Sequence, residues 1–179
     1  MRHTAVAIVT VLAVCVAGAQ ESEHGSVDTV IQEAKTAYSM QKDFILAAAD
    51  KMPEGNYSFK PTPEIRSYGE LFTHIVQVQN AACALIAGQT PSRPTTSQPM
   101  TKPEIVAQLK ASFDSCGAAN ATVTTANALD VVGKGFLHGT RVGLIQKNAA
   151  HDNEMYGTIA VYLRLKGIVP PSTAARGRM

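Results

Sequence analysis

Apolar residues recur at helical spacing along residues 27–52. They are separated by three, four or seven positions, which places them on one face of an α-helix. The members of this stripe are Val27, Val30, Ile31, Ala34, Tyr38, Ile45, Ala48 and Met52. The pattern predicts a first amphipathic helix, and the prolines and glycine of residues 53–63 predict a loop after it.

Two capping boxes mark the starts of the next two helices. Ser67 and Glu70 are three residues apart, as are Thr101 and Glu104, and in each pair both side chains satisfy free amides at a helix start. The second helix is therefore expected from Ser67 to about residue 87. The third begins at Thr101, with apolar residues at helical spacing as far as residue 123. The proline-containing segment 88–102 between them is expected to be a surface loop.

The last helix is expected from about residue 140 to residue 166. Three glycines between residues 133 and 139 interrupt the pattern before it, and Gly167 with the Pro170-Pro171 pair ends it. Four amphipathic segments without an alternating strand pattern predict an all-α fold, a four-helix bundle. The predicted domain covers residues 27–172, between a flexible N-terminus at residues 20–26 and a flexible tail at residues 173–179.

Composition agrees with one globular domain. The 179 residues are 45% hydrophobic and 17% charged, with a net charge of +2 and no cluster of basic residues, so nucleic acid is not an expected partner. A Ser-His-Asp order, a P-loop, a GxGxxG motif and a paired-carboxylate signature are absent from the sequence, which leaves the common hydrolase, nucleotide-binding and glycosidase interpretations without support.

Residues 1–19 have the pattern of a secretory signal peptide. Arg2 supplies the positive charge, residues 5–16 are uncharged and apolar, and small residues at positions 17–19 suit cleavage before Gln20. The apolar run is shorter than the ~20 residues that span a bilayer. We therefore expect an exported protein, periplasmic or secreted, with no membrane contact after cleavage. A lipoprotein modified at Cys15 is the minor alternative, because Val14 is bulkier than such sites prefer.

Cleavage leaves two cysteines, Cys83 and Cys116. In an oxidising compartment such a pair favours a disulfide, here one that joins the second and third helices. Two buried thiols are the alternative. Cys83 follows His74 by nine residues, about 180° around the helix, so it is expected to point away from any site that His74 lines.

Two polar residues interrupt the apolar face of the last predicted helix. Asn148 and Asp152 fall within the apolar arc of its helical wheel, where each unsatisfied polar group would cost roughly 1 to 3 kcal/mol. This interruption is typical of a functional site. A buried polar network, or a salt bridge to Arg141 or Lys35, would give the same pattern.

A histidine lies at the edge of the apolar face on each of two predicted helices. His74 is on the second helix and His151 on the last, and helix bundles build metal sites from imidazoles that converge in this way. A histidine at the boundary of a core is also commonly no more than hydrogen-bonded. Zinc as a rule needs a third protein ligand, and the candidates are Met155, Glu154, Asp152 and Glu70.

Two segments of the chain together resemble the DinB-like (YfiT-type) family of metal-dependent proteins. They are residues 57–75, YSFKPTPEIRSYGELFTHI, and residues 151–171, HDNEMYGTIAVYLRLKGIVPP. The resemblance implies a four-helix bundle that binds zinc or nickel through three histidines, one on the second helix and two spaced four apart on the last. His74 and His151 match the first two positions, and Met155 stands at the third. A thioether is a poor ligand for zinc or nickel and suits copper(I) better.

Two functional hypotheses follow. In the first, the protein is a metalloenzyme in which His74 and His151 hold a divalent ion and Glu154, Asp152 or water completes the shell. The reaction would be hydrolysis or thiol transfer on a small molecule. The catalytic residues and the substrate stay unassigned. In the second, the same bundle has lost the metal and binds a small ligand or a protein partner. The family resemblance also makes a homodimer an expected assembly.

Overall fold

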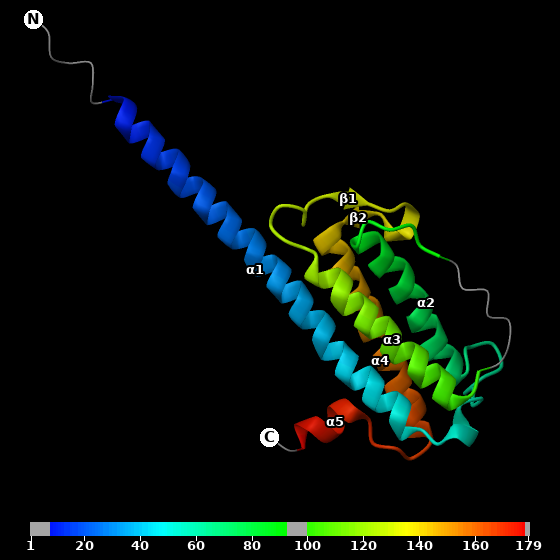
Figure 1. The fold of residues 1–179 in the computed structure, drawn as a ribbon. Coiled ribbons are helices and arrows are strands. Elements are labelled where there is room, and N and C mark those ends of the chain that lie inside the picture. The colour runs from blue at the N-terminus through cyan, green and yellow to red at the C-terminus, as the bar shows by residue number, and fades with distance from the viewer. Residues whose placement is uncertain (1–7, 93–99, 178–179) are drawn as a thin grey trace, which may run out of the picture.

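The computed structural model describes residues 8–92 and 100–177, and helices dominate the fold (Figure 1). The four long helices are α1 (Ile8–Lys51), α2 (Tyr68–Ile86), α3 (Lys102–Ala121) and α4 (Arg141–Leu165), and α5 (Pro171–Arg176) is a short one. Two 3-10 turns, Glu54–Asn56 and Gly135–Leu137, and two short strands, β1 (Val131–Val132) and β2 (Gly139–Thr140), complete the elements. The predicted all-α class is confirmed.

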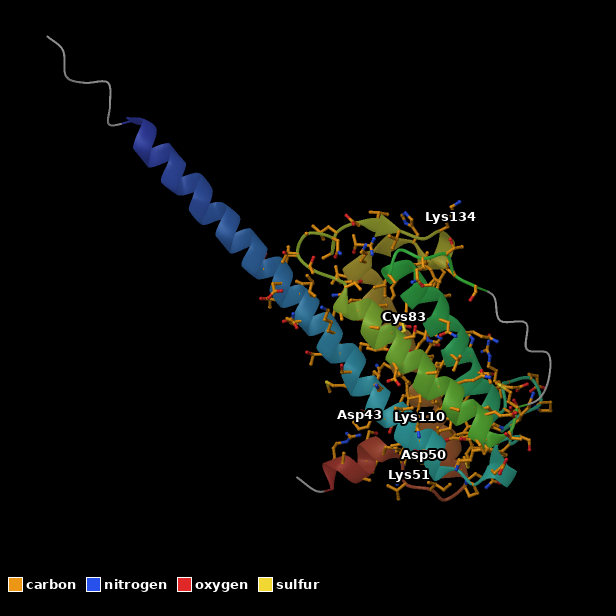
Figure 2. All side chains as sticks on the ribbon, viewed as in Figure 1. Asp43, Asp50, Lys51, Cys83, Lys110 and Lys134 are labelled. Atoms are coloured by element: carbon orange, nitrogen blue, oxygen red, sulfur yellow. A yellow bond between two sulfur atoms is a disulfide. The ribbon has the colours of Figure 1, made fainter. Side chains whose placement is uncertain are left out.

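The four long helices pack as a bundle around one apolar core. α1 packs mainly against α4, and α2 lies between α3 and α4. Buried side chains from each helix meet inside, among them Ile45, Phe72, Phe113 and Ile145, all with 0% exposure. Charged residues such as Lys110 lie on the outside (Figure 2). In the described part of the chain, no helix has both the length and the apolar character to cross a membrane.

The first helix is longer than the sequence pattern predicts. α1 begins at Ile8 and continues through residues 20–26, which we expected to be a flexible N-terminus. Its N-terminal part extends beyond the other helices in Figure 1. The predicted cleavage position before Gln20 therefore lies within a helix, and residues 1–7 of the predicted signal peptide lie outside the described residues. The signal peptide stays a prediction.

Both predicted capping boxes form. The Glu70 amide donates to Ser67 Oγ at 3.3 Å, and the Ser67 amide donates to Glu70 Oε2 at 2.6 Å. At the start of α3, the Thr101 amide donates to Glu104 Oε2 at 2.8 Å. These bonds satisfy backbone groups that the first helical turn leaves free. They fix where α2 begins, and His74 lies two turns further on.

A small hairpin that the sequence pattern did not reveal leads into α4. β1 and β2 pair antiparallel, with Val131 opposite Thr140. Gly133 has a φ of +75°, and a Cβ at that position would lie 2.1 Å from Leu137 O, so only glycine fits the turn. Thr140 then caps α4 by accepting a hydrogen bond from the Gly143 amide at 3.1 Å. The hairpin sets the start of the helix that carries His151.

The segment after α4 contains α5, a helical turn that we did not predict within the expected flexible tail. Pro171 stands in its first turn, where a missing amide proton costs nothing. Ser172 exchanges hydrogen bonds with the Tyr156 hydroxyl at 2.8 and 2.9 Å, and Arg164 donates to Thr173 Oγ1 at 3.0 Å. Side chains of α4 therefore hold α5 in place.

Candidate functional site

The two predicted histidines meet between α2 and α4. His74 Nε2 lies 3.2 Å from His151 Nε2, and the two ring centroids are 5.0 Å apart. α2 packs directly on α4, so each helix presents one imidazole to the other. The two Nε2 atoms converge on a common point at the edge of the core.

Burial and charge both act on His74, which is partly exposed. Desolvation lowers its pKa below the usual value, and the neighbouring Arg66 and His151 act in the same direction, while Glu154 opposes them. His74 is therefore neutral at pH 7, which is the form that binds metal ions.

His74 also borders the surface. A cleft of about 310 Å³ opens beside it, with Lys60, Arg66, Glu70, Thr73 and Gln77 among its lining residues. A larger cleft of about 600 Å³ along α2 shares Glu70, Thr73 and Gln77 with the first. His74 is therefore the member of the pair that a small molecule in this cleft could contact.

Asp152 is buried in the interior next to this pair. Its side chain has 0% exposure, and Oδ1 lies 3.7 Å from His151 Nδ1. Burial raises the pKa of Asp152, and the neighbouring His151 opposes the increase. The salt bridge considered in the sequence analysis is wrong, because Lys35 Nζ donates to Val123 O at 3.0 Å and Arg141 pairs with Asp130 at 3.5 Å.

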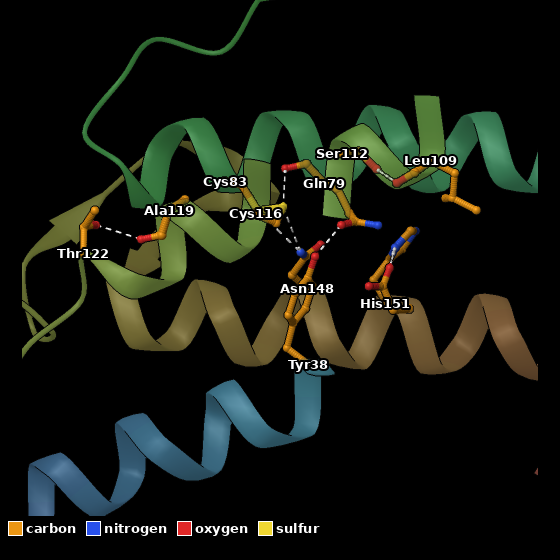
Figure 3. Close-up of a disulfide and its surroundings, with 11 residues drawn as sticks. Tyr38, Gln79, Cys83, Leu109, Ser112, Cys116, Ala119, Thr122, Asn148 and His151 are labelled. Carbon is orange, nitrogen blue, oxygen red and sulfur yellow. Dashed lines mark hydrogen bonds and ion pairs between the residues drawn. A yellow bond between two sulfur atoms is a disulfide. The ribbon is translucent and has the colours of Figure 1, made fainter. Parts of the chain in front are cut away.

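Asn148 lies one turn before Asp152 and contacts the disulfide (Figure 3). Its Nδ2 is 3.7 Å from Cys83 Sγ and 3.9 Å from Cys116 Sγ. Cys83 and Cys116 are joined, with their Cα atoms 5.1 Å apart, so the predicted disulfide forms and the alternative of two thiols is wrong. Asn148 thus connects the disulfide to the polar residues of α4. This link was not anticipated by the expectation that Cys83 points away from any site at His74.

Gln79 belongs to the same interior and was missed. It is completely buried on α2, and its Oε1 accepts a hydrogen bond from the Tyr38 hydroxyl at 2.6 Å (Figure 3). Gln79 lies four residues after Ile75 and four before Cys83, within the apolar face of α2. A polar residue within the apolar arc of a helical wheel was the criterion that identified Asn148 and Asp152 on α4. The same criterion applied to α2 would have identified Gln79.

The third position of the ligand pattern differs from the two histidines. Met155 is buried with 8% exposure one turn after His151, and Glu154 is exposed, as the wheel indicated. Among the described residues, no group of three or more His, Cys, Asp or Glu side chains could hold a metal ion. The histidine pair is therefore the centre of the candidate site, and a third side-chain ligand would have to be of another type, such as the Met155 thioether one turn after His151.

A four-helix bundle with a histidine pair between its second and last long helices is the class that this fold and site define. The sequence model of the DinB superfamily matches residues 37–159, and the chain belongs to that superfamily. A DinB-like protein from Bacillus subtilis has a similar structure, with a TM-score of 0.64 and 19% identity over 75% of this chain and 92% of that one. A DinB-like protein from Bacillus cereus also has a TM-score of 0.64, with 14% identity over 78% and 95% of the two chains. None of the curated proteins matches this chain.

Proposed function

We propose that this DinB-superfamily protein binds a metal ion through His74 and His151. The observation that carries the proposal is the 3.2 Å separation of the two Nε2 atoms. A tetrahedral ion with metal–nitrogen bonds of 2.0–2.1 Å holds two ligand nitrogens about 3.3 Å apart. The metal-free geometry is therefore close to the one that chelation requires.

The donor set bears on the identity of the ion. Zinc and nickel are the ions that the DinB-like resemblance implies. Two imidazoles with the Met155 thioether would suit copper(I), whereas the exposed Glu154 carboxylate would suit a harder divalent ion. We therefore propose His74 and His151 as fixed ligands with Met155 as the third, because Glu154 forms no group of three ligands with the two histidines among the described residues.

The chemistry proposed for the site is hydrolysis or thiol transfer on a small molecule. A metal ion held there would lower the pKa of a bound water or thiol. The cleft lined by Lys60, Arg66 and Thr73 supports this proposal, because it gives a small molecule access to His74. Arg66 and Lys60 contribute positive charge beside that access route.

We also propose that the protein is exported. The support is the N-terminal pattern of residues 1–19 together with the Cys83–Cys116 disulfide, since disulfides persist mainly in oxidising compartments. The mature chain would begin at Gln20.

A metal-free binding module of the same fold is the second candidate. Met155 at the third ligand position favours it, and so does the finding that, among the described residues, no group of three His, Cys, Asp or Glu side chains could hold an ion. In that case the cleft beside His74 would bind a small molecule without catalysing a reaction.

Elemental analysis of the mature protein, purified without chelators or a histidine tag, tests these candidates. We expect about one metal ion per chain, lost in His74→Ala and in His151→Ala. His138→Ala is the matched control, because His138 is an exposed histidine in the hairpin that leads into α4. Wild-type protein without metal, with a melting temperature that zinc, nickel and copper(I) all leave unchanged, would favour the binding module.

A further inference from the structure

The two ring nitrogens of His151 face different partners. Nε2 faces His74 Nε2 at 3.2 Å, and Nδ1 faces Asp152 Oδ1 at 3.7 Å. Nδ1 and Nε2 lie on opposite sides of the imidazole. A carboxylate on the Nδ1 side therefore does not reach an ion bound at Nε2. This geometry separates Asp152 from the ligands, although the sequence pattern allowed it as one.

Asp152 and His151 have complementary unpaired atoms. Both oxygens of Asp152 and Nδ1 of His151 are buried and lack a hydrogen-bond partner within the described part of the chain. A carboxylate only accepts and a protonated Nδ1 only donates, so each supplies what the other lacks. An approach of about 1 Å would turn the 3.7 Å contact into a charge-assisted hydrogen bond of about 2.8 Å.

Gln79 supplies a second unpaired donor to the same interior. Because the Tyr38 hydroxyl occupies Gln79 Oε1, the amide nitrogen Nε2 is the group left over, and it is buried without a partner among the described residues. Asp152 lies close enough to Tyr38 for its charge to raise the pKa of that hydroxyl. Figure 3 shows Tyr38, Gln79, Asn148 and His151 gathered in this interior.

The contact between the two histidines constrains which ring nitrogen of each carries the proton. Two lone pairs at 3.2 Å would repel, so in the metal-free protein one Nε2 atom carries a proton and the other accepts it. If His151 keeps its proton on Nδ1, His74 is the donor. The two imidazoles are then opposite tautomers.

We propose that Asp152 is a positioning residue that fixes His151 as the Nδ1–H tautomer and leaves the Nε2 lone pair available to a metal ion. The role toward a metal rests on the proposed function. The tautomer is a property of the metal-free protein and stands on its own. Partners of this kind orient histidine ligands and raise their basicity, and losing one typically weakens metal binding 10- to 100-fold.

The test is ¹⁵N NMR of the imidazoles in the mature metal-free protein, with zinc and copper(I) affinities measured in parallel. We expect His151 protonated on Nδ1 and His74 protonated on Nε2. Asp152→Leu should shift His151 away from the Nδ1–H form and weaken binding of the ion at least tenfold. The urea midpoint should fall as well, because the variant leaves the buried Nδ1–H of His151 without an acceptor. Asp152→Asn, whose amide oxygen still accepts, should restore most of the Nδ1–H form.

Asn153→Leu is the matched control, since it makes the same change at the neighbouring exposed position and should alter neither readout. Wild-type His151 protonated on Nε2 would overturn the inference even if Asp152→Leu failed to fold. Unchanged tautomer and affinity in a folded Asp152→Leu would also overturn it. A tautomer that depends on Asp152 in a protein that binds neither ion would support the positioning role and refute the proposed metal site.

Discussion

At the residue scale, the side chain at position 155 bears on which metal ion the proposed site would hold. His151 and Met155 lie one turn apart on α4, where the DinB-like pattern implies two histidines, and Met155 is already buried. A third imidazole there would complete the number of ligands that zinc requires. The thioether leaves the pair of His74 and His151 without a third nitrogen.

Met155→His should therefore raise the affinity for zinc and nickel by at least tenfold, and lower any preference for copper(I). Competition with a chromogenic chelator measures both affinities. Met155→Leu is the control, because it removes the sulfur but keeps a side chain of similar volume. It should weaken copper(I) binding without improving zinc binding. Equal zinc affinities in wild type and Met155→His would show that position 155 does not face the ion.

Residue patterns also determined how much of the site could be predicted. Asn148 and Asp152 stood out because each interrupts an apolar arc, and both are buried at 2% and 0% exposure. Gln79 interrupts the apolar arc of α2 in the same way, but it was not among the predicted site residues. That Asp152 lies on the Nδ1 side of His151 could not be predicted, since it depends on rotamers that spacing does not specify.

At the element scale, the Ser67/Glu70 capping box and the disulfide restrain the two ends of α2. Glu70 accepts from the Ser67 amide at the helix start, and Cys83 ties the other end of the same helix to α3. His74 lies between these two restraints. The cap was predicted from four local residues. The disulfide was predicted from the export signal, because cleavage leaves two cysteines with only one possible pairing.

The cap makes the stability of α2 sensitive to acid. Hydrogen bonds from Ser67, the backbone bond first, lower the pKa of Glu70 in the folded protein below its usual value. A lowered folded pKa stabilises the protein above the unfolded pKa, and this contribution is lost as the pH falls through the folded value. Glu70→Gln should reduce the change in unfolding free energy between about pH 6 and pH 3.

The effect should be less than about 1 kcal/mol, because Glu70 is half exposed. Urea unfolding at several pH values measures it. Glu33→Gln, at an exposed glutamate of α1, should follow the wild-type curve. A Glu70→Gln curve parallel to that of the wild type would show that the cap does not titrate with folding.

The disulfide should contribute substantially to stability. It closes a loop with a sequence separation of 33 residues, for which loop-closure entropy predicts about 3 to 4 kcal/mol. Cys83→Ser with Cys116→Ser should lower the urea midpoint accordingly and leave the slope similar. Reduced wild-type protein should unfold near the double variant. A midpoint that responds to neither change would mean that the unfolded chain gains little freedom when the bond is absent.

At the scale of the whole molecule, hydrophobic periodicity was enough to predict the four long helices and the bundle. The hairpin before α4 escaped prediction because β1 and β2 have two residues each, too few for an alternating pattern. α5 escaped because its hydrogen bonds to Tyr156 and Arg164 join residues of different elements. The extension of α1 to Ile8 was not predicted, because the signal-peptide pattern assigned residues 1–19 to a separate segment.

Export is tested on the intact protein. Mass spectrometry of the protein from the periplasm or culture medium should find a chain that begins at Gln20 and contains no free thiol. Ala19→Pro should slow the cleavage, since proline disturbs the small-residue site. A full-length chain beginning at Met1 in the cytoplasm, with both cysteines reduced, would contradict export and leave the proposed metal site unaffected.

The disulfide between α2 and α3 also affects what a single proteolytic cut does to the protein. Together with the backbone from Cys83 to Cys116 it forms a covalent ring, and the connection between the two helices, including the proline-containing segment after Gly88, belongs to that ring. A protease that cuts this connection once opens the ring without releasing a fragment. α2 and α3 would then stay tethered, and the protein could keep its histidine pair after a cut that would divide a disulfide-free bundle into two chains.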